Sequence, residues 1–149
     1  MAEIGFYHLD RMPLDEVLPK LLEKALGSGA RIVLRAPDAG AVERINRLLW
    51  TYGQSSFLPH GSAVDGRSEE QPIYLTAQDE NPNGADILVQ VEGAEAGDLP
   101  GYRRVLDLFD GGNAEALAAA RARWRAYKEA GHLLTYWQQK PQGGWDKKA

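Results

Sequence analysis

The chain lacks cysteine altogether, which excludes disulfides, thiolate metal ligands and a cysteine nucleophile. This absence fits a reducing compartment. The longest apolar runs are about five residues, far shorter than the ~20 residues of a membrane span. The first ten residues are acidic and contain no basic segment, so they do not resemble a signal peptide. We therefore expect a cytoplasmic protein that has no membrane partner.

The sequence also lacks the motifs of nucleotide, metal and catalytic sites. The junction His8–Pro13, between the first predicted strand and helix, contains no glycine, and no phosphate-binding G-x-x-x-x-G-K-[ST] motif occurs. The three histidines, His8, His60 and His132, have no ligand partner at a recurring metal spacing. No serine lies in a nucleophile-elbow context. We expect no cofactor, no metal site and no catalytic residue.

What remains is an ordinary globular composition with an acidic balance. The 149 residues suit one domain, and 44% hydrophobic with 26% charged residues excludes wholesale disorder. The net charge is −4, whereas a protein that binds a phosphate backbone usually has a basic face. The basic residues are concentrated near the C-terminus, at Arg103, Arg104, Arg121, Arg123, Arg125 and Lys128.

Strand and helix patterns alternate along the chain with short links. The pattern predicts strands at Ile4–Leu9, Arg31–Arg35, Ile73–Thr76, Ile87–Val91 and Arg104–Phe109. It predicts helices at Leu14–Leu26, Val42–Trp50 and Ala114–Ala130, the first with a kink or a late start at Pro19. This order predicts a single α/β domain with a mostly parallel sheet flanked by helices. We expect Gly61–Gln71 to be a loop and His132–Gln138 to add a last helical turn. Residues 140–149 are expected to form a flexible tail after a domain of residues 1–139.

The long C-terminal helix carries the most informative pattern. Arg121, Arg125 and Lys128 lie at i, i+4 and i+7 and share a face, with Trp124 and Tyr127 beside them. Guanidinium groups flanked by aromatic rings suit a carboxylate joined to an apolar side chain. The alternative is a solvated basic face whose tryptophan and tyrosine belong to the core.

A second stretch is unusually aromatic. Residues 48–60 contain Trp50, Tyr52, Phe57 and Leu58 around a glycine and two serines. Exposed aromatics of this kind mark protein contacts. The alternative is that Trp50 completes the buried stripe of its helix.

Three motifs give the sequence a family resemblance. F-Y-H-L at the start, L-W-T-Y-G-Q-S-S-F-L-P-H in the middle and A-R-x-R-W-R-x-Y-K-x-A-G near the end resemble the chi subunits of bacterial DNA polymerase III. The order and spacing of the motifs agree over roughly residues 1–138. The resemblance implies a Rossmann-like fold without a nucleotide site.

The resemblance also implies a function. Chi subunits are non-catalytic accessories of the clamp-loader complex; they bind the acidic C-terminal tail of single-stranded DNA-binding protein (SSB) and in many bacteria pair with a psi subunit. Position by position, Trp50, Arg121 and Trp124 would form the SSB-tail site, with Arg121 receiving a carboxylate. Contact with DNA would be only indirect.

The chain departs from the family pattern at two positions. Trp124 stands where other members carry tyrosine, and Leu117 stands where they carry a lysine, so Arg125 or Lys128 would have to supply that charge. The middle motif, with Phe57, Leu58 and Pro59, matches the surface that faces psi or another partner.

Two other functions compete with tethering. The βαβ order alone suits a nucleotide-dependent enzyme, although the glycine motif is missing. The basic helix with its aromatics suits direct binding of single-stranded nucleic acid, which the acidic pI near 5.4 disfavours.

Overall fold

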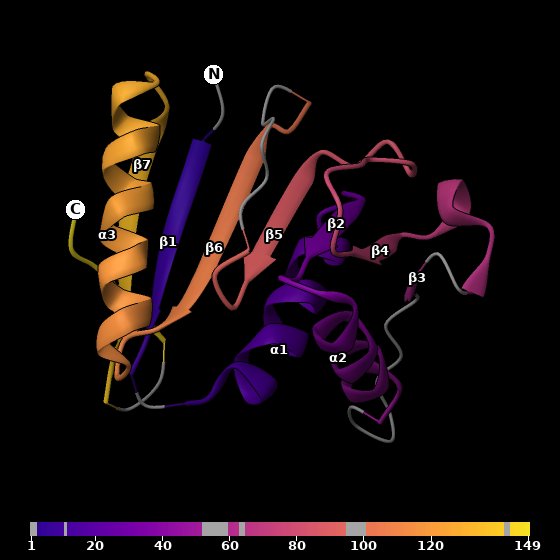
Figure 1. Ribbon diagram of the computed structural model, residues 1–149, viewed down its shortest axis with the longest axis horizontal. Coiled ribbons are helices and arrows are strands. Elements are labelled where there is room, and N and C mark those ends of the chain that lie inside the picture. Colours follow the sequence, from indigo (N-terminus) through magenta and orange to yellow (C-terminus); the bar gives the residue numbers. More distant parts are fainter. Residues whose placement is uncertain (1–2, 11, 52–59, 63–64, 95–100, 142–143) are drawn as a thin grey trace.

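The protein is built on one eight-stranded sheet with the strand order β3-β4-β2-β5-β6-β1-β7-β8 (Figure 1). The computed structural model describes residues 3–10, 12–51, 60–62, 65–94, 101–141 and 144–149. In chain order the elements are β1 (Glu3–Leu9), α1 (Leu14–Gly27), β2 (Ile32–Arg35), α2 (Ala39–Thr51), β3 (His60–Ser62), the short helix η2 (Ser68–Glu70), β4 (Ile73–Thr76), β5 (Ile87–Val91), β6 (Arg104–Asp110), α3 (Ala114–Glu129), β7 (Leu133–Gln139) and β8 (Trp145–Lys147).

The sheet is mostly parallel. Strand β1 pairs in parallel with β6 on one side and with β7 on the other. The pairs β3 with β4, β4 with β2, β2 with β5 and β5 with β6 are also parallel. Among the described strands, β7 and β8 form the antiparallel pair. Helices α1, α2 and α3 supply the connections from β1 to β2, from β2 to β3 and from β6 to β7. The predicted α/β class is confirmed.

Alternation along the strands divides the core into two layers. Ile32 and Leu34 of β2 pack with the buried residues of α1 and α2, whereas Val33 between them packs on the opposite face. That second face is covered by α3, over β6, β1 and β7. Figure 1 shows α3 and α2 at opposite ends of the sheet.

Helix α1 begins at Leu14, directly after Pro13, and continues through Pro19 to Gly27. The late start that Pro19 led us to expect is therefore wrong. The side chain of Pro19 is buried together with Val17, Leu18 and Leu22. Packing of this apolar stripe on the sheet compensates for the backbone donor that proline lacks.

The C-terminal region departs most from the sequence-based expectation. Residues predicted to add a helical turn form β7, and part of the expected tail forms β8, which pairs with it. Helix α3 does stop where predicted, because Gly131 adopts a left-handed φ of 90°. The strand then forms because the edge of β1 is available to pair with it, a long-range contact that local patterns do not encode.

The edge strand β3 also lies partly within a segment expected to be a loop. Gly61 and Ser62 pair with Tyr74 and Leu75 of β4. None of the helices in the described part of the chain is both long enough and apolar enough to cross a membrane.

Candidate functional site

The inner face of α3 carries a buried ion pair. Arg123 donates from Nε to Asp107 Oδ2 at 2.7 Å and from a terminal nitrogen to Asp107 Oδ1 at 2.9 Å. Both side chains are nearly inaccessible to solvent, at 3% and 2% exposed. Gln90 donates to Asp107 at 3.1 Å and to the Tyr127 hydroxyl at 2.9 Å. This bidentate pair fixes the rotation of α3 against β5 and β6.

Sequence reasoning missed this pair by counting Arg123 with the other basic residues. The available signal was its position three residues after Ala120, on the stripe that α3 buries. Its partner was not recognisable from the sequence, because Asp107 lies 16 positions away within an apolar strand.

An aromatic cluster lies under the side of α3 that faces β7. The Trp124 ring packs edge-on against Phe6 at 5.4 Å and against Tyr136 at 5.8 Å, measured between ring centroids. The Tyr136 hydroxyl lies 2.7 Å from His8 Nδ1. Trp124 and Tyr136 are both half-buried, so each leaves part of its ring at the surface.

The outer side of α3 is basic. Arg121, Arg125 and Lys128 are all exposed, as their shared spacing predicted. Burial raises the pKa of the Tyr136 hydroxyl, the positive charge of Arg121 lowers it and the negative charge of Asp10 raises it. Arg121 lies three residues before Trp124, so the two side chains are neighbours on the helix surface. We call Arg121, Trp124, Arg125 and Lys128 the α3 outer surface. It joins cationic groups to an accessible aromatic edge.

The basic face of this helix is exposed to solvent, as the second interpretation predicted, whereas binding of a carboxylate stays a prediction. Trp124 and Tyr127 are both half-buried against the core and both contact the Phe6 ring, and Tyr127 also accepts a hydrogen bond from Gln90. Leu117 is half-buried against the same cluster and contributes apolar surface.

The structure does not bring Trp50 together with the α3 outer surface, so a single pocket built from both is wrong. Trp50 lies at the end of α2, beside β3 and β4, and its ring contacts the His60 ring at a centroid distance of 4.8 Å. Helix α3 contacts β6 and β7, and β4 and β7 are five strand spacings apart in the sheet, about 24 Å. Trp50 is 59% exposed, so it does not complete the buried stripe of α2.

The partner surface assigned to Phe57, Leu58 and Pro59 lies outside the described residues. That assignment remains a prediction. The closest described residues on either side are Thr51 and His60.

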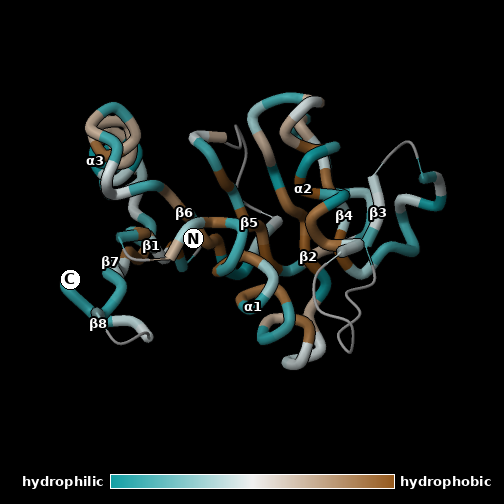
Figure 2. The backbone as a smooth tube through the Cα atoms, turned by 90° about the horizontal axis from the view of Figure 1, so that it is seen from below, coloured by the Kyte–Doolittle hydropathy of each residue, from teal (hydrophilic) through white to brown (hydrophobic). Residues whose placement is uncertain are grey.

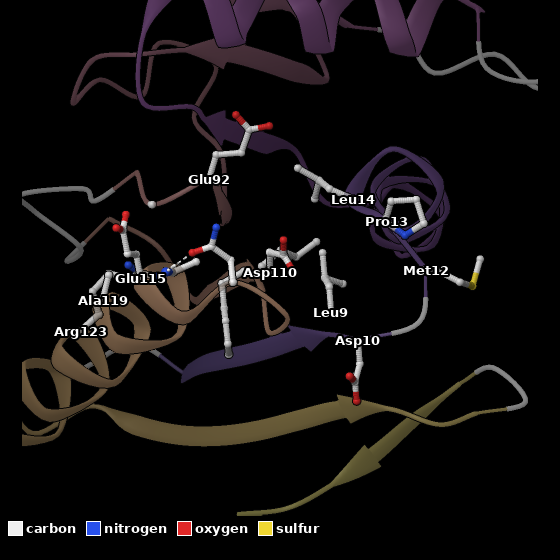
Figure 3. Close-up of a pocket in the computed structure, with 15 residues that line it drawn as sticks. Leu9, Asp10, Met12, Pro13, Leu14, Glu92, Asp110, Glu115, Ala119 and Arg123 are labelled. Atoms are coloured by element: carbon white, nitrogen blue, oxygen red, sulfur yellow. Dashed lines mark hydrogen bonds between the residues drawn. The ribbon is translucent and has the colours of Figure 1, made fainter.

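A crevice opens where folds of this class bind ligands, at the carboxyl ends of β1 and β6 between α1 and α3. Its volume is about 710 Å³. Four acidic residues line it, Asp10, Glu92, Asp110 and Glu115, of which Asp10 points its carboxylate toward β7 and accepts a hydrogen bond from Gln138 (Figure 3). The cation in its wall, Arg123, is already neutralised by Asp107. This charge balance is unfavourable for a phosphate group, in agreement with the missing glycine loop.

The histidines do not form a metal site. Within the described ranges there is no group of three histidine, aspartate or glutamate side chains arranged to hold a metal ion. His8 and His60 instead contact the Tyr136 hydroxyl and the Asn46 carbonyl oxygen.

Comparison with known proteins shows the family of this chain. The family model of the DNA polymerase III chi subunit, HolC, matches residues 1–135, which include all of α3. The chain belongs to the chi subunit family. Its members are accessory subunits of DNA polymerase III in DNA replication.

Three curated chi subunits are similar to this chain. A probable subunit from Rickettsia prowazekii is 30% identical over 109 residues, covering 73% of this chain and 66% of that protein. The subunit from Pseudomonas aeruginosa is 28% identical, with 90% and 94% covered. The subunit from Escherichia coli is 25% identical, with 90% and 96% covered. The family match ends within β7, so Trp137 and β8 lie beyond it.

Proposed function

We propose that this chi subunit is a non-catalytic tether, which binds the acidic C-terminal peptide of SSB through the α3 outer surface. It would thereby link the clamp loader and the replicase to SSB-coated template. The observation that carries the proposal is that exposed Arg121 lies one helical turn before half-buried Trp124, whose ring packs against Tyr136.

This surface suits a peptide that ends in an aromatic residue and a free carboxylate. Arg121 offers a planar guanidinium group that binds a carboxylate in two hydrogen bonds. The edges of Trp124 and Tyr136 offer apolar contact for the terminal phenylalanine. Arg125 and Lys128, further along the helix, offer positive charge to the acidic residues that precede the terminal phenylalanine of the peptide. They would take the place of the lysine that other family members carry at the position of Leu117.

Such a contact is small and therefore weak. We expect a Kd in the micromolar range, about −7 to −8 kcal/mol, that weakens as salt screens the exposed charges. Weak binding allows the replicase to release one tail and engage the next as it moves.

A second surface, at the end of α2, is proposed for psi or another protein partner. Its support is the exposure of the Trp50 ring, close in sequence to Phe57, Leu58 and Pro59. We assign Trp50 to this surface and not to the SSB-tail site, because the width of the sheet separates it from α3.

The test is a titration of labelled peptide ending in Asp-Phe-Pro-Phe, with a control peptide that lacks the last residue. R121A should weaken binding by about 1.5–3 kcal/mol, roughly 10- to 100-fold, because it removes a charge-assisted contact. R47A is the matched control: Arg47 is also exposed on a helix, but it lies at the other end of the sheet. Equal affinity of R121A and the wild type would refute the site.

The same preparation separates tethering from the two alternatives. A nucleotide-dependent enzyme would bind or turn over ATP or NAD, and we expect neither. Tight oligonucleotide binding that R121A abolishes would instead assign the α3 outer surface to nucleic acid.

A further inference from the structure

The face of the sheet opposite α3 carries a group of aromatic side chains on β1, β7 and β8. The Tyr7 ring lies over Gly5, where an added Cβ atom would approach Tyr7 Cε1 to 3.0 Å. The Trp137 indole lies back along β7, with its Nε1 donating to Thr135 Oγ1 at 3.0 Å. The planes of the two rings differ by 9°, and their centroids are 6.4 Å apart. Two neighbouring strands therefore present nearly parallel rings along the sheet.

Strand β8 adds a third ring to this surface. Trp145 meets Tyr7 edge-on, with an interplanar angle of 84° and a centroid distance of 5.1 Å. We call Tyr7, Trp137 and Trp145 the aromatic platform. Two nearly parallel rings with a third ring perpendicular to Tyr7 offer aromatic faces and edges to a planar group.

The platform is partly accessible: Tyr7 and Trp145 pack against the edge of the core under α1, and the strongest described helix contact of β7 is with α3, on the other face. Helix α1 packs over β6, and α3 packs on the other face (Figure 2). The three platform residues are half-buried, and Leu133, on the same face of β7, is 58% exposed. An aromatic surface left open in this way is available to a ligand.

The charges at its border are mainly positive. Lys147 lies directly opposite Trp137 in the β7–β8 pair and is exposed. Burial raises the pKa of the Tyr7 hydroxyl, and the charge of Arg104 beside it lowers that pKa. Glu3 lies opposite Arg104 and is the anion on this border. Asp146 pairs with Lys148 at 3.1 Å, and both alternate away from Lys147 along β8.

We infer that the aromatic platform is a binding surface for single-stranded nucleic acid, with bases stacked on Tyr7 and Trp137 and phosphates near Lys147 and Arg104. Stacking on aromatic rings beside cations is the general way in which proteins hold unpaired bases without reading their sequence. Aromatic rings next to positive side chains favour a ligand that combines planar rings with negative charge. It does not select a basic peptide, which Lys147 and Arg104 would repel.

This contact differs from the tether in position and in chemistry. The overall charge of −4 makes it weak for the isolated chain. A chain already held at SSB-coated DNA would experience a high effective concentration of strand, so a weak platform would suffice there. The inference revises the expectation that DNA is contacted only indirectly, because β8 and the placement of Trp145 were not foreseen.

The test uses the full chain and a fluorescein-labelled, single-stranded oligonucleotide of deoxythymidine at low salt, read by anisotropy. W137A should weaken binding roughly tenfold, because one stacking contact is lost. K147E should weaken it by a similar factor while leaving the affinity for the SSB peptide unchanged. Because Lys147 is exposed, K147E tests the inference even where W137A lowers stability.

R47E is the matched control for K147E, since it makes the same change of charge on the α2 side of the sheet. The inference holds if W137A and K147E weaken binding and R47E does not. It is overturned if the wild type does not bind the oligonucleotide, or if R47E and K147E have equal effects. It is also overturned if analytical ultracentrifugation shows a wild-type dimer that W137A disrupts, because the platform is then an interface between two copies.

Discussion

The two faces of α3 differ in the burial of their arginines. Arg123 is buried and held by both oxygens of Asp107, whereas Arg121 and Arg125, two positions away on either side, are exposed. The inner arginine fixes how the helix sits on the sheet. The outer arginines are free of that structural task and are available to a partner. Basic residues that are close together in a sequence can therefore have two separate roles, one in the buried core and one at the exposed surface.

The largest expected difference between the faces is in stability. R123A should lower the free energy of unfolding by about 3–5 kcal/mol, because it leaves the Asp107 charge buried without its partner. R125A should change that free energy by no more than about 0.5 kcal/mol. Urea denaturation of both variants measures the difference.

A double variant, R123M with D107L, separates the cost of an unpaired charge from the value of the pair. Apolar residues of similar size should recover most of the lost stability. Similar losses in R123A and R125A would contradict the distinction between the two faces.

A smaller effect concerns Tyr102, in the core beneath α3. Burial raises the pKa of Tyr102 to about 12, with Asp79 and Glu80 adding to the shift and Arg35 opposing it. Above pH 10 the unfolded chain releases this proton and the folded chain keeps it, so alkali favours unfolding. The free energy of unfolding should fall by up to roughly 2 kcal/mol between pH 10 and 12.

Y102F provides the control for this pH dependence. Its stability should fall less steeply over the same interval, as measured by denaturation at fixed pH values. An unchanged slope in Y102F would mean that other tyrosines, such as Tyr7 and Tyr74, whose pKa values burial also raises, account for the alkaline loss.

The smallest expected change in stability concerns the N-terminus of α3, the helix that carries both faces. Asn113 caps the helix by accepting a hydrogen bond from the Ala116 backbone N–H at 2.9 Å. N113A should cost about 1 kcal/mol of stability, and N113S should retain most of it. Thermal unfolding compares the two, and an equal loss in both would show that the cap contributes little.

Several features of the protein follow from the sequence alone. The apolar spacing of α1, α2 and α3 and the apolar runs of β2, β4 and β5 predict an α/β domain, because burial of these patterns requires a parallel sheet between helices. The missing glycine loop predicts the absence of a phosphate site. The spacing of Arg121, Arg125 and Lys128 predicts their shared exposed face.

Tertiary structure alone decides the rest. Whether residues 133–139 become helix or strand depends on the open edge of β1, and whether Trp145 belongs to a tail depends on β7. The separation of Trp50 from Arg121 depends on the strand order, which a linear pattern does not contain. The burial of Arg123 depends on an aspartate supplied by another element. Local periodicity determines what a segment can form, and long-range pairing determines which partner it meets.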